Sequence, residues 1–152
     1  MRDRAVNGEL PEPLAETRLE IALHFSNGAR LGPDELRIIA AIRKQRSILG
    51  ASRATGVSYR TCWLIVDALN RAFEQPVIAT HPGRRGGGAE LTPFGERLVA
   101  VHASIERRSR AQAKPALSEI AAALNPGFKR RASPGASEDA NPEAAPRRSQ
   151  GS

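Results

Sequence analysis

The chain contains little cysteine and few aromatic residues. One cysteine in 152 residues excludes an internal disulfide, and no cluster of Cys and His offers a structural zinc site. Aromatic residues make up 4% of the chain and all hydrophobic residues 40%, which allows a small aliphatic core. We therefore expect one compact domain with tails, and no metal or cofactor.

Long apolar runs and catalytic motifs are also missing. No run approaches the ~20 apolar residues of a membrane helix, and residues 1–12 lack the apolar centre of a signal peptide. A cytoplasmic protein with no membrane partner is expected. There is no paired carboxylate set, no Ser/His/Asp arrangement and no Gly-x-x-x-x-Gly-Lys sequence. The glycines at 86–88 lead into a strand rather than a helix, which makes them weak evidence for nucleotide binding. We therefore expect no enzyme.

Acidic residues are outnumbered by basic ones. The formal net charge is +7 and the pI is near 10.9. Between Arg30 and Lys114 there are 15 Lys or Arg and 7 Asp or Glu, so the basic excess lies in the folded part. Such a chain is attracted to polyanions, and arginine suits bidentate contacts to phosphate or guanine. An arginine-favouring genome would give the same composition, so charge alone does not decide.

The most informative segment runs from Ser47 to Thr61. Ser47 and Ser58 can each cap a helix, because a serine oxygen accepts the unpaired N–H groups of a first turn. Gly56 lies between them, where a left-handed backbone allows a sharp turn. This spacing is typical of a helix-turn-helix, whose second helix can enter the DNA major groove.

Regular elements are predicted before and after this segment. Residues 18–25 alternate as a half-buried strand, and a first helix begins at Pro33 and ends near Arg46. A third helix runs from Ser58 to about Phe73. Its buried stripe recurs at spacings of three and four: Cys62, Ile65, Val66, Leu69 and Phe73.

Three side chains of the third helix have specific expectations. Cys62 lies on the buried stripe and is expected to be a core side chain rather than a redox switch. Asp67 is expected to pair with Arg71, four residues on. Trp63 flanks the stripe and is expected to serve packing or a dimer contact.

The C-terminal half predicts a hairpin and a long helix. Residues 75–80 and 89–91 read as strands joined by a basic, glycine-rich tip, which is the form of a wing. Thr92 and Pro93 suit the start of a helix over 92–114. Pro115 should kink or end it, and residues 115–124 can continue it as a second piece.

The predicted fold class is mainly α with a small β-hairpin: a winged helix-turn-helix over residues 17–114 with a long C-terminal dimerisation helix. Residues 1–16 are expected to form a flexible arm. Residues 125–152 are rich in Pro, Ala, Ser and Arg and are expected to form a disordered tail.

Two segments resemble the ModE-type molybdenum-responsive regulators. GVSYRTCWLIVDALN, from Gly56 to Asn70, is similar to their recognition region, and GRRGGGAELTPFG, from Gly83 to Gly95, is similar to their wing and last helix. The resemblance covers roughly residues 17–114. It implies a LysR-type winged helix that dimerises through its long helix and binds operator DNA. The family usually has Gly where Arg46 stands and Ser where Leu49 stands.

The resemblance does not extend to molybdate sensing. Full-length members carry a C-terminal pair of small β-barrel subdomains that bind molybdate, whereas about 28 residues follow Leu124 here. The chain resembles short members that have only the DNA-binding domain and no small-molecule effector domain.

The first turn of the third helix is the predicted DNA-reading end, because this end enters the groove in helix-turn-helix docking. Its residues are Ser58, Tyr59, Arg60 and Thr61. Arg60 can fork to guanine O6 and N7, and Tyr59 or Thr61 can reach a phosphate or a thymine methyl. The alternative for Arg60 is a solvated surface arginine.

Backbone contacts are predicted on either side of this helix. Arg84 and Arg85, at the wing tip, are expected to meet phosphates or the minor groove. Their alternative is a charged loop that only prevents aggregation. Ser47 and Arg53 are expected to contact the DNA backbone from the second helix.

A narrow apolar seam marks the long helix. Phe94, Leu98, Val101 and Ile105 recur at four, three and four, as in a coiled coil. The seam can pack on its own domain or on a second copy, and we expect a homodimer. Two-fold symmetry would require an inverted-repeat operator with half-sites about one helical turn, or a multiple, apart.

Two functional hypotheses follow. The first is a sequence-specific transcriptional regulator that binds double-stranded DNA, and the resemblance suggests a link to molybdate transport or molybdenum metabolism. The alternative is a protein-interaction module that docks on, or heterodimerises with, a longer regulator.

Overall fold

The computed structural model describes residues 17–83 and 88–131. These residues form four helices and two small antiparallel sheets, in this order: β1 (Leu23–His24), β2 (Arg30–Leu31), α1 (Pro33–Gln45), α2 (Ile48–Thr55), α3 (Tyr59–Ala72), β3 (Ile78–His81), β4 (Gly88–Leu91) and α4 (Pro93–Ala122). The mainly helical character is confirmed. The arm predicted for 1–16, residues 132–152 of the predicted tail, and Arg84 and Arg85 lie outside the described residues.

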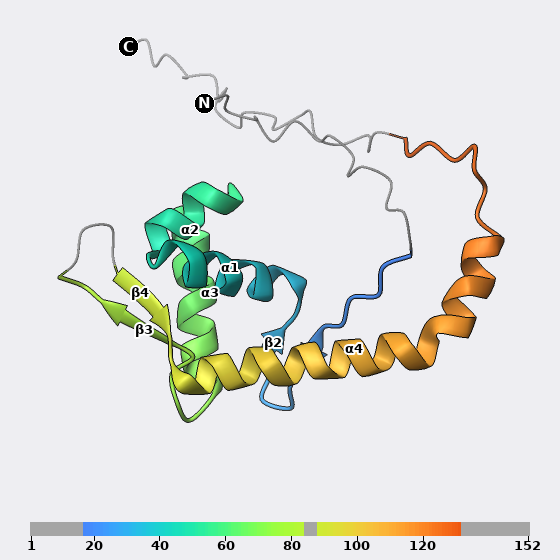
Figure 1. Ribbon diagram of the computed structural model, residues 1–152. Coiled ribbons are helices and arrows are strands. Elements are labelled where there is room, and N and C mark those ends of the chain that lie inside the picture. Colours follow the sequence, from blue (N-terminus) through green and yellow to red (C-terminus); the bar gives the residue numbers. More distant parts are fainter. Residues whose placement is uncertain (1–16, 84–87, 132–152) are drawn as a thin grey trace, which may run out of the picture.

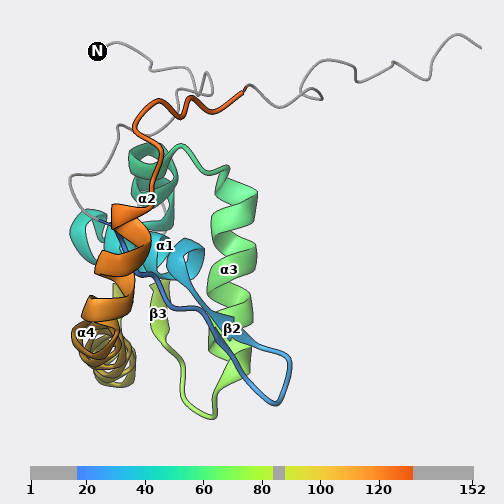
Figure 2. The ribbon, with the colours of Figure 1, turned by 90° about the vertical axis from the view of Figure 1, so that its right-hand side faces the viewer.

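The helices enclose the core from several sides. α1, α2 and α3 group together with the β3–β4 hairpin beside them, and α4 runs along one side of the group and extends past it (Figure 1). A quarter turn shows α3 and α4 on opposite sides of α1 (Figure 2). Among the described residues, no helix combines the length and the apolar character that crossing a bilayer requires.

Aliphatic side chains from α1, α2, α3 and the hairpin form the core. Its buried members are Leu31, Ile38, Ile39, Ile42, Ile48, Ala51, Cys62, Val66, Leu69, Val77, Ile78 and Ala89. At its edge the rings of Phe25, Phe73 and Phe94 meet edge to face, with centroids 5.5 and 5.4 Å apart. This chain of rings joins the end of α3 to the start of α4.

The helix starts that the sequence predicts are confirmed. Ser47, Ser58 and Thr92 each cap the helix that follows. Their side-chain oxygens accept the N–H group three residues further on, at 2.8, 3.2 and 2.9 Å respectively. Gly56 ends α2 with φ 73°, the left-handed conformation expected of it.

The predicted N-terminal strand was wrong in extent, and a second small hairpin was missed. Only Leu23 and His24 of the predicted segment 18–25 form a strand, and they pair with Arg30–Leu31. Residues 17–22, before β1, form no helix or strand. The carbonyl of Ile21 accepts a hydrogen bond from Nε2 of the buried His102 on α4, at 2.8 Å. A contact with a helix therefore takes the place of the first part of the predicted strand.

Pro115 does not end α4. The helix is continuous over 30 residues to Ala122, so much of the predicted second piece belongs to the same helix. Its axis bends in the C-terminal part (Figure 1), which fits a proline that lacks an N–H group and crowds the preceding turn.

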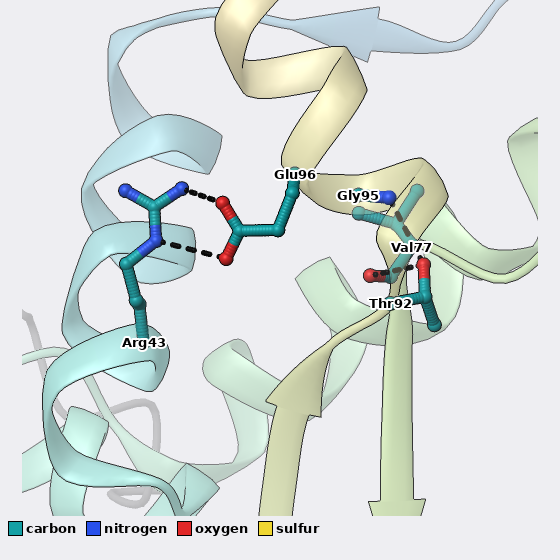
Figure 3. Close-up of polar contacts among 5 residues, drawn as sticks. All are labelled: Arg43, Val77, Thr92, Gly95 and Glu96. Atoms are coloured by element: carbon teal, nitrogen blue, oxygen red, sulfur yellow. Dashed lines mark hydrogen bonds and ion pairs between the residues drawn. The ribbon is translucent and has the colours of Figure 1, made fainter.

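The first turn of α4 is anchored at two points (Figure 3). The Thr92 N–H donates to Val77 O at 3.0 Å, and the Thr92 hydroxyl donates to Pro76 O at 2.6 Å. Arg43 of α1 makes a two-pronged ion pair with Glu96, its Nε lying 3.2 Å from Oε1. These contacts fix α4 against the residues just before β3 and against α1.

Gly95 allows this close approach, since a Cβ there would overlap the carbonyl oxygen of Val77. We expect Gly95→Ala to lower the free energy of unfolding by about 1–3 kcal/mol through overpacking, although alanine is normally about 1 kcal/mol better than glycine in a helix. Urea unfolding measures the difference. Gly83→Ala is the matched control, because no atom lies within 4 Å of its added Cβ. Wild-type stability of Gly95→Ala would contradict the predicted overlap.

Candidate nucleic-acid interface

The first turn of α3 is open to solvent, as a DNA-reading end requires. Ser58, Tyr59, Arg60 and Thr61 are all exposed, and Tyr59 retains 43% of its accessible surface. Arg60 makes no hydrogen bond or ion pair with any residue of 17–83 or 88–131. The opposite side of the helix carries the buried stripe, so α3 is held by one face and presents the other.

Local contacts set the side chains of this turn. Ser58 Oγ accepts the Thr61 N–H and donates to Thr61 Oγ1 at 2.9 Å. Because Thr61 Oγ1 accepts in this bond, its own hydrogen remains for an acceptor such as a phosphate oxygen. The Tyr59 ring meets Trp63 edge to face at 6.2 Å, which identifies Trp63 as a packing partner within the helix.

The turn between α2 and α3 is held by its own hydrogen bonds. Ser52 Oγ donates to Val57 O at 2.6 Å, and Arg37 Nη2 donates to Thr55 O at 2.6 Å. Arg53 is exposed and unpaired within the described part of the chain. Ser47 differs from it, because its half-buried oxygen is already used in the cap. Of the two residues predicted to contact the DNA backbone from α2, Arg53 is therefore the more accessible.

Asn70 attaches the hairpin to α3. Its Oδ1 accepts the N–H groups of Val77 and Ile78 at 2.9 Å each, and its Nδ2 donates to Ile78 O at 2.9 Å. Asn70 lies outside the apolar stripe that the sequence predicts for this helix, and no role is predicted for it. The neighbouring residues in the sequence are the same whether an asparagine binds the backbone of a distant strand or faces solvent. No sequence signal could therefore have identified the role of Asn70.

The other strand of the hairpin is attached to the α1–α2 turn. The Ala89 N–H donates to Arg46 O at 3.1 Å, and Ser47 and Gly88 form a β-bridge. Arg46 has φ 58°, and it is the single non-glycine residue with positive φ among the described residues. Its guanidinium lies 3.4 Å from a Glu90 carboxylate oxygen. The hairpin is thus held at two points, by Asn70 on α3 and by the α1–α2 turn, and it lies beside the helices (Figure 1).

Two titratable side chains of α3, Asp67 and Cys62, have structural partners. The predicted pair of Asp67 and Arg71 is confirmed at 3.0 Å. Cys62 is fully buried, as predicted, and its thiol points to Val57 O at 3.8 Å. Burial raises the pKa of the Cys62 thiol, and the backbone hydrogen bond opposes this in part. Cys62 therefore has the properties of a core residue.

An open groove of about 500 Å³ lies between α3 and the β1–β2 turn. Asn27 lines it from the turn, Arg30 lines it from β2, and Thr61, Leu64 and Arg71 line it from α3. Within residues 17–83 and 88–131, no group of three or more His, Cys, Asp or Glu side chains is placed to hold a metal ion.

The predicted seam of α4 is divided between two environments. Phe94 and Leu98 pack against the core of their own chain, whereas Val101 is 39% exposed and Ile105 is half-buried. The face of α4 turned to the body centres on the buried Gly95 and His102. Only the later part of the seam is therefore open to a second molecule.

Comparison with known proteins gives partial matches. No protein-family model matches the chain. It is 44% identical over 80 residues to molybdenum-pterin-binding protein MopB of Rhodobacter capsulatus, covering 52% of this chain and 30% of that protein. It is 32% identical over 87 residues to molybdenum transport protein ModE of Azotobacter vinelandii, covering 57% and 33%.

A third relative is DNA-binding transcriptional dual regulator ModE of Escherichia coli (strain K12), which is 28% identical over 71 residues. That match covers 46% of this chain and 27% of the relative. The chain thus spans about a third of the length of the curated relatives it matches.

The left-handed conformation of Arg46 is testable by two substitutions at one position. Both remove the exposed ion pair with Glu90, which is worth at most about 1 kcal/mol. Arg46→Ala keeps a Cβ at φ 58°, whereas Arg46→Gly relieves a cost of about 1–2 kcal/mol. We expect the glycine variant to be more stable than the alanine variant by about that amount in urea unfolding. Equal stabilities would show that this backbone is unstrained.

Proposed function

We propose that this chain is a sequence-specific DNA-binding transcriptional regulator with a winged helix-turn-helix of the ModE type. The observation that carries the proposal is the exposed first turn of α3, where Arg60 has no partner among the described residues. The similarity to relatives named as ModE regulators supports it. The names of these relatives also link them to molybdenum, so we extend the proposal to genes of molybdate transport or molybdenum metabolism.

The proposed interface consists of α3 and the β3–β4 hairpin. α3 lies in the major groove, whose width admits one helix, and Arg60 forms two hydrogen bonds to a guanine edge. Thr61 and Arg53 contact phosphates on either side. The hairpin is the wing, and Arg84 and Arg85 at its tip contact phosphates or the minor groove. The basic excess of the folded part supplies attraction that weakens steeply with salt.

Two arginine substitutions separate base reading from backbone binding. We expect Arg60→Ala to weaken binding to the selected operator by about ten- to a hundredfold and to relax base choice at one position. Arg85→Ala should weaken binding to all duplexes alike and reduce the salt slope by about one. Fluorescence anisotropy on operator and scrambled duplexes at two salt concentrations measures both effects.

Arg108→Ala is the control for lost positive charge, since Arg108 is exposed on α4 and unpaired within the described residues. The operator is obtained by selecting bound fragments from genomic DNA. Absence of duplex binding at low salt would end the proposal. Equal loss of base choice from both substitutions would contradict the assigned division of roles.

We also propose that the protein is a homodimer paired through α4. The exposed Val101 and the half-buried Ile105 form the open part of the seam, on a helix that extends beyond the body. A symmetric pair would present two α3 helices to an inverted repeat.

A buried charge should break such a pair. We expect Val101→Glu to convert the dimer to a monomer, because an unpaired carboxylate in an apolar contact is costly. Sedimentation velocity measures the change. Ala103→Glu is the matched control, because Ala103 is exposed and about 200° around α4 from Val101. A dimer that survives Val101→Glu would place the contact elsewhere.

A further inference from the structure

Leu64 is a large apolar side chain at the centre of the outward face of α3. It keeps 57% of its surface exposed and is not among the hydrophobic residues that pack against the core. Cys62 and Val66, two positions away on either side, are both buried. Two residues correspond to about 200° around a helix, so Leu64 points away from both.

The neighbours of Leu64 make its position informative. A single exposed leucine on a protein surface needs no explanation. Here, however, the leucine shares a helix face with Arg60, one turn earlier. Leu64 also lines the open groove beside the β1–β2 turn, so one side of its side chain is not covered by protein. The middle of the surface that we place in the major groove is therefore apolar.

The chemistry of the major groove identifies what an apolar side chain can recognise there. Thymine presents a 5-methyl group, whereas the other base edges present hydrogen-bonding groups. Leucine can neither donate nor accept, so it would desolvate those polar edges without compensation. Four residues of helix rise about 6 Å, which is close to the span of two base pairs at about 3.4 Å each.

We infer that Leu64 is a specificity-determining residue that contacts the 5-methyl group of a thymine, one or two base pairs from the guanine bound by Arg60. The inference rests on the proposed function and adds to it a base at a second position. Leu64 gives the operator half-site a thymine requirement that hydrogen bonds do not supply.

Removing single methyl groups from the DNA tests this contact directly. The full chain selects its operator from random duplexes, and each thymine is then replaced in turn by deoxyuridine. At one position we expect the replacement to weaken wild-type binding about fourfold, as expected for one buried methyl group. The same replacement should leave Leu64→Ala unaffected. At that position, 5-methylcytosine should bind wild type more tightly than cytosine does, and this difference should vanish in Leu64→Ala.

Leu124→Ala is the matched control, because Leu124 is an exposed leucine beyond the end of α4. Deoxyuridine should weaken duplex binding by Leu124→Ala as much as it weakens binding by wild type. A melting temperature of Leu64→Ala equal to that of wild type verifies that the fold of the variant is intact. If deoxyuridine weakens wild type and Leu64→Ala equally at every position, the inference is overturned while the proposed function stands. If wild type selects no duplex, both are overturned.

Discussion

The three hydrogen bonds of Asn70 hold the two parts of the proposed interface in one arrangement. Without them, α3 and β3 would be linked at this point by a short connecting segment and by aliphatic contacts that do not specify direction. The N–H groups of Val77 and Ile78 lie in buried residues, so losing the Asn70 acceptor would leave them without a partner. Such an orphaned group costs about 1–3 kcal/mol. Asn70 therefore both stabilises the hairpin and sets its direction.

A second constraint lies on the opposite strand of the hairpin. The α1–α2 turn must adopt a left-handed conformation at Arg46 for its carbonyl to accept the Ala89 N–H. Glycine would adopt this conformation at no steric cost. Arginine brings a strained backbone together with an ion pair to Glu90 on the hairpin. The strain persists because the surrounding contacts over-determine it.

Features that depend on interactions between residues close in the sequence could be predicted, and features that depend on distant residues could not. Ser47, Ser58 and Thr92 were identifiable because a cap needs only its own first turn. β2 was missed because two residues carry no alternation, and the turn before it depends on Asn27 donating to Ala72 O at the end of α3. Asn70 and His102 could not be assigned, since their partners lie in other elements. The exposed end of α3 was predictable because helical periodicity alone separates its two faces.

The arrangement of the helices makes the two proposed activities compatible. α3 runs from its junction with α2 down to α4, so its first turn lies at the end remote from α4 (Figure 1). A partner along α4 would leave that turn uncovered. Pairing would also change affinity without touching DNA, because binding the first half-site makes binding the second intramolecular. In the proposed dimer, the seam residues on α4 would therefore change operator affinity without contacting DNA, and the apolar periodicity of a remote helix would become part of DNA recognition.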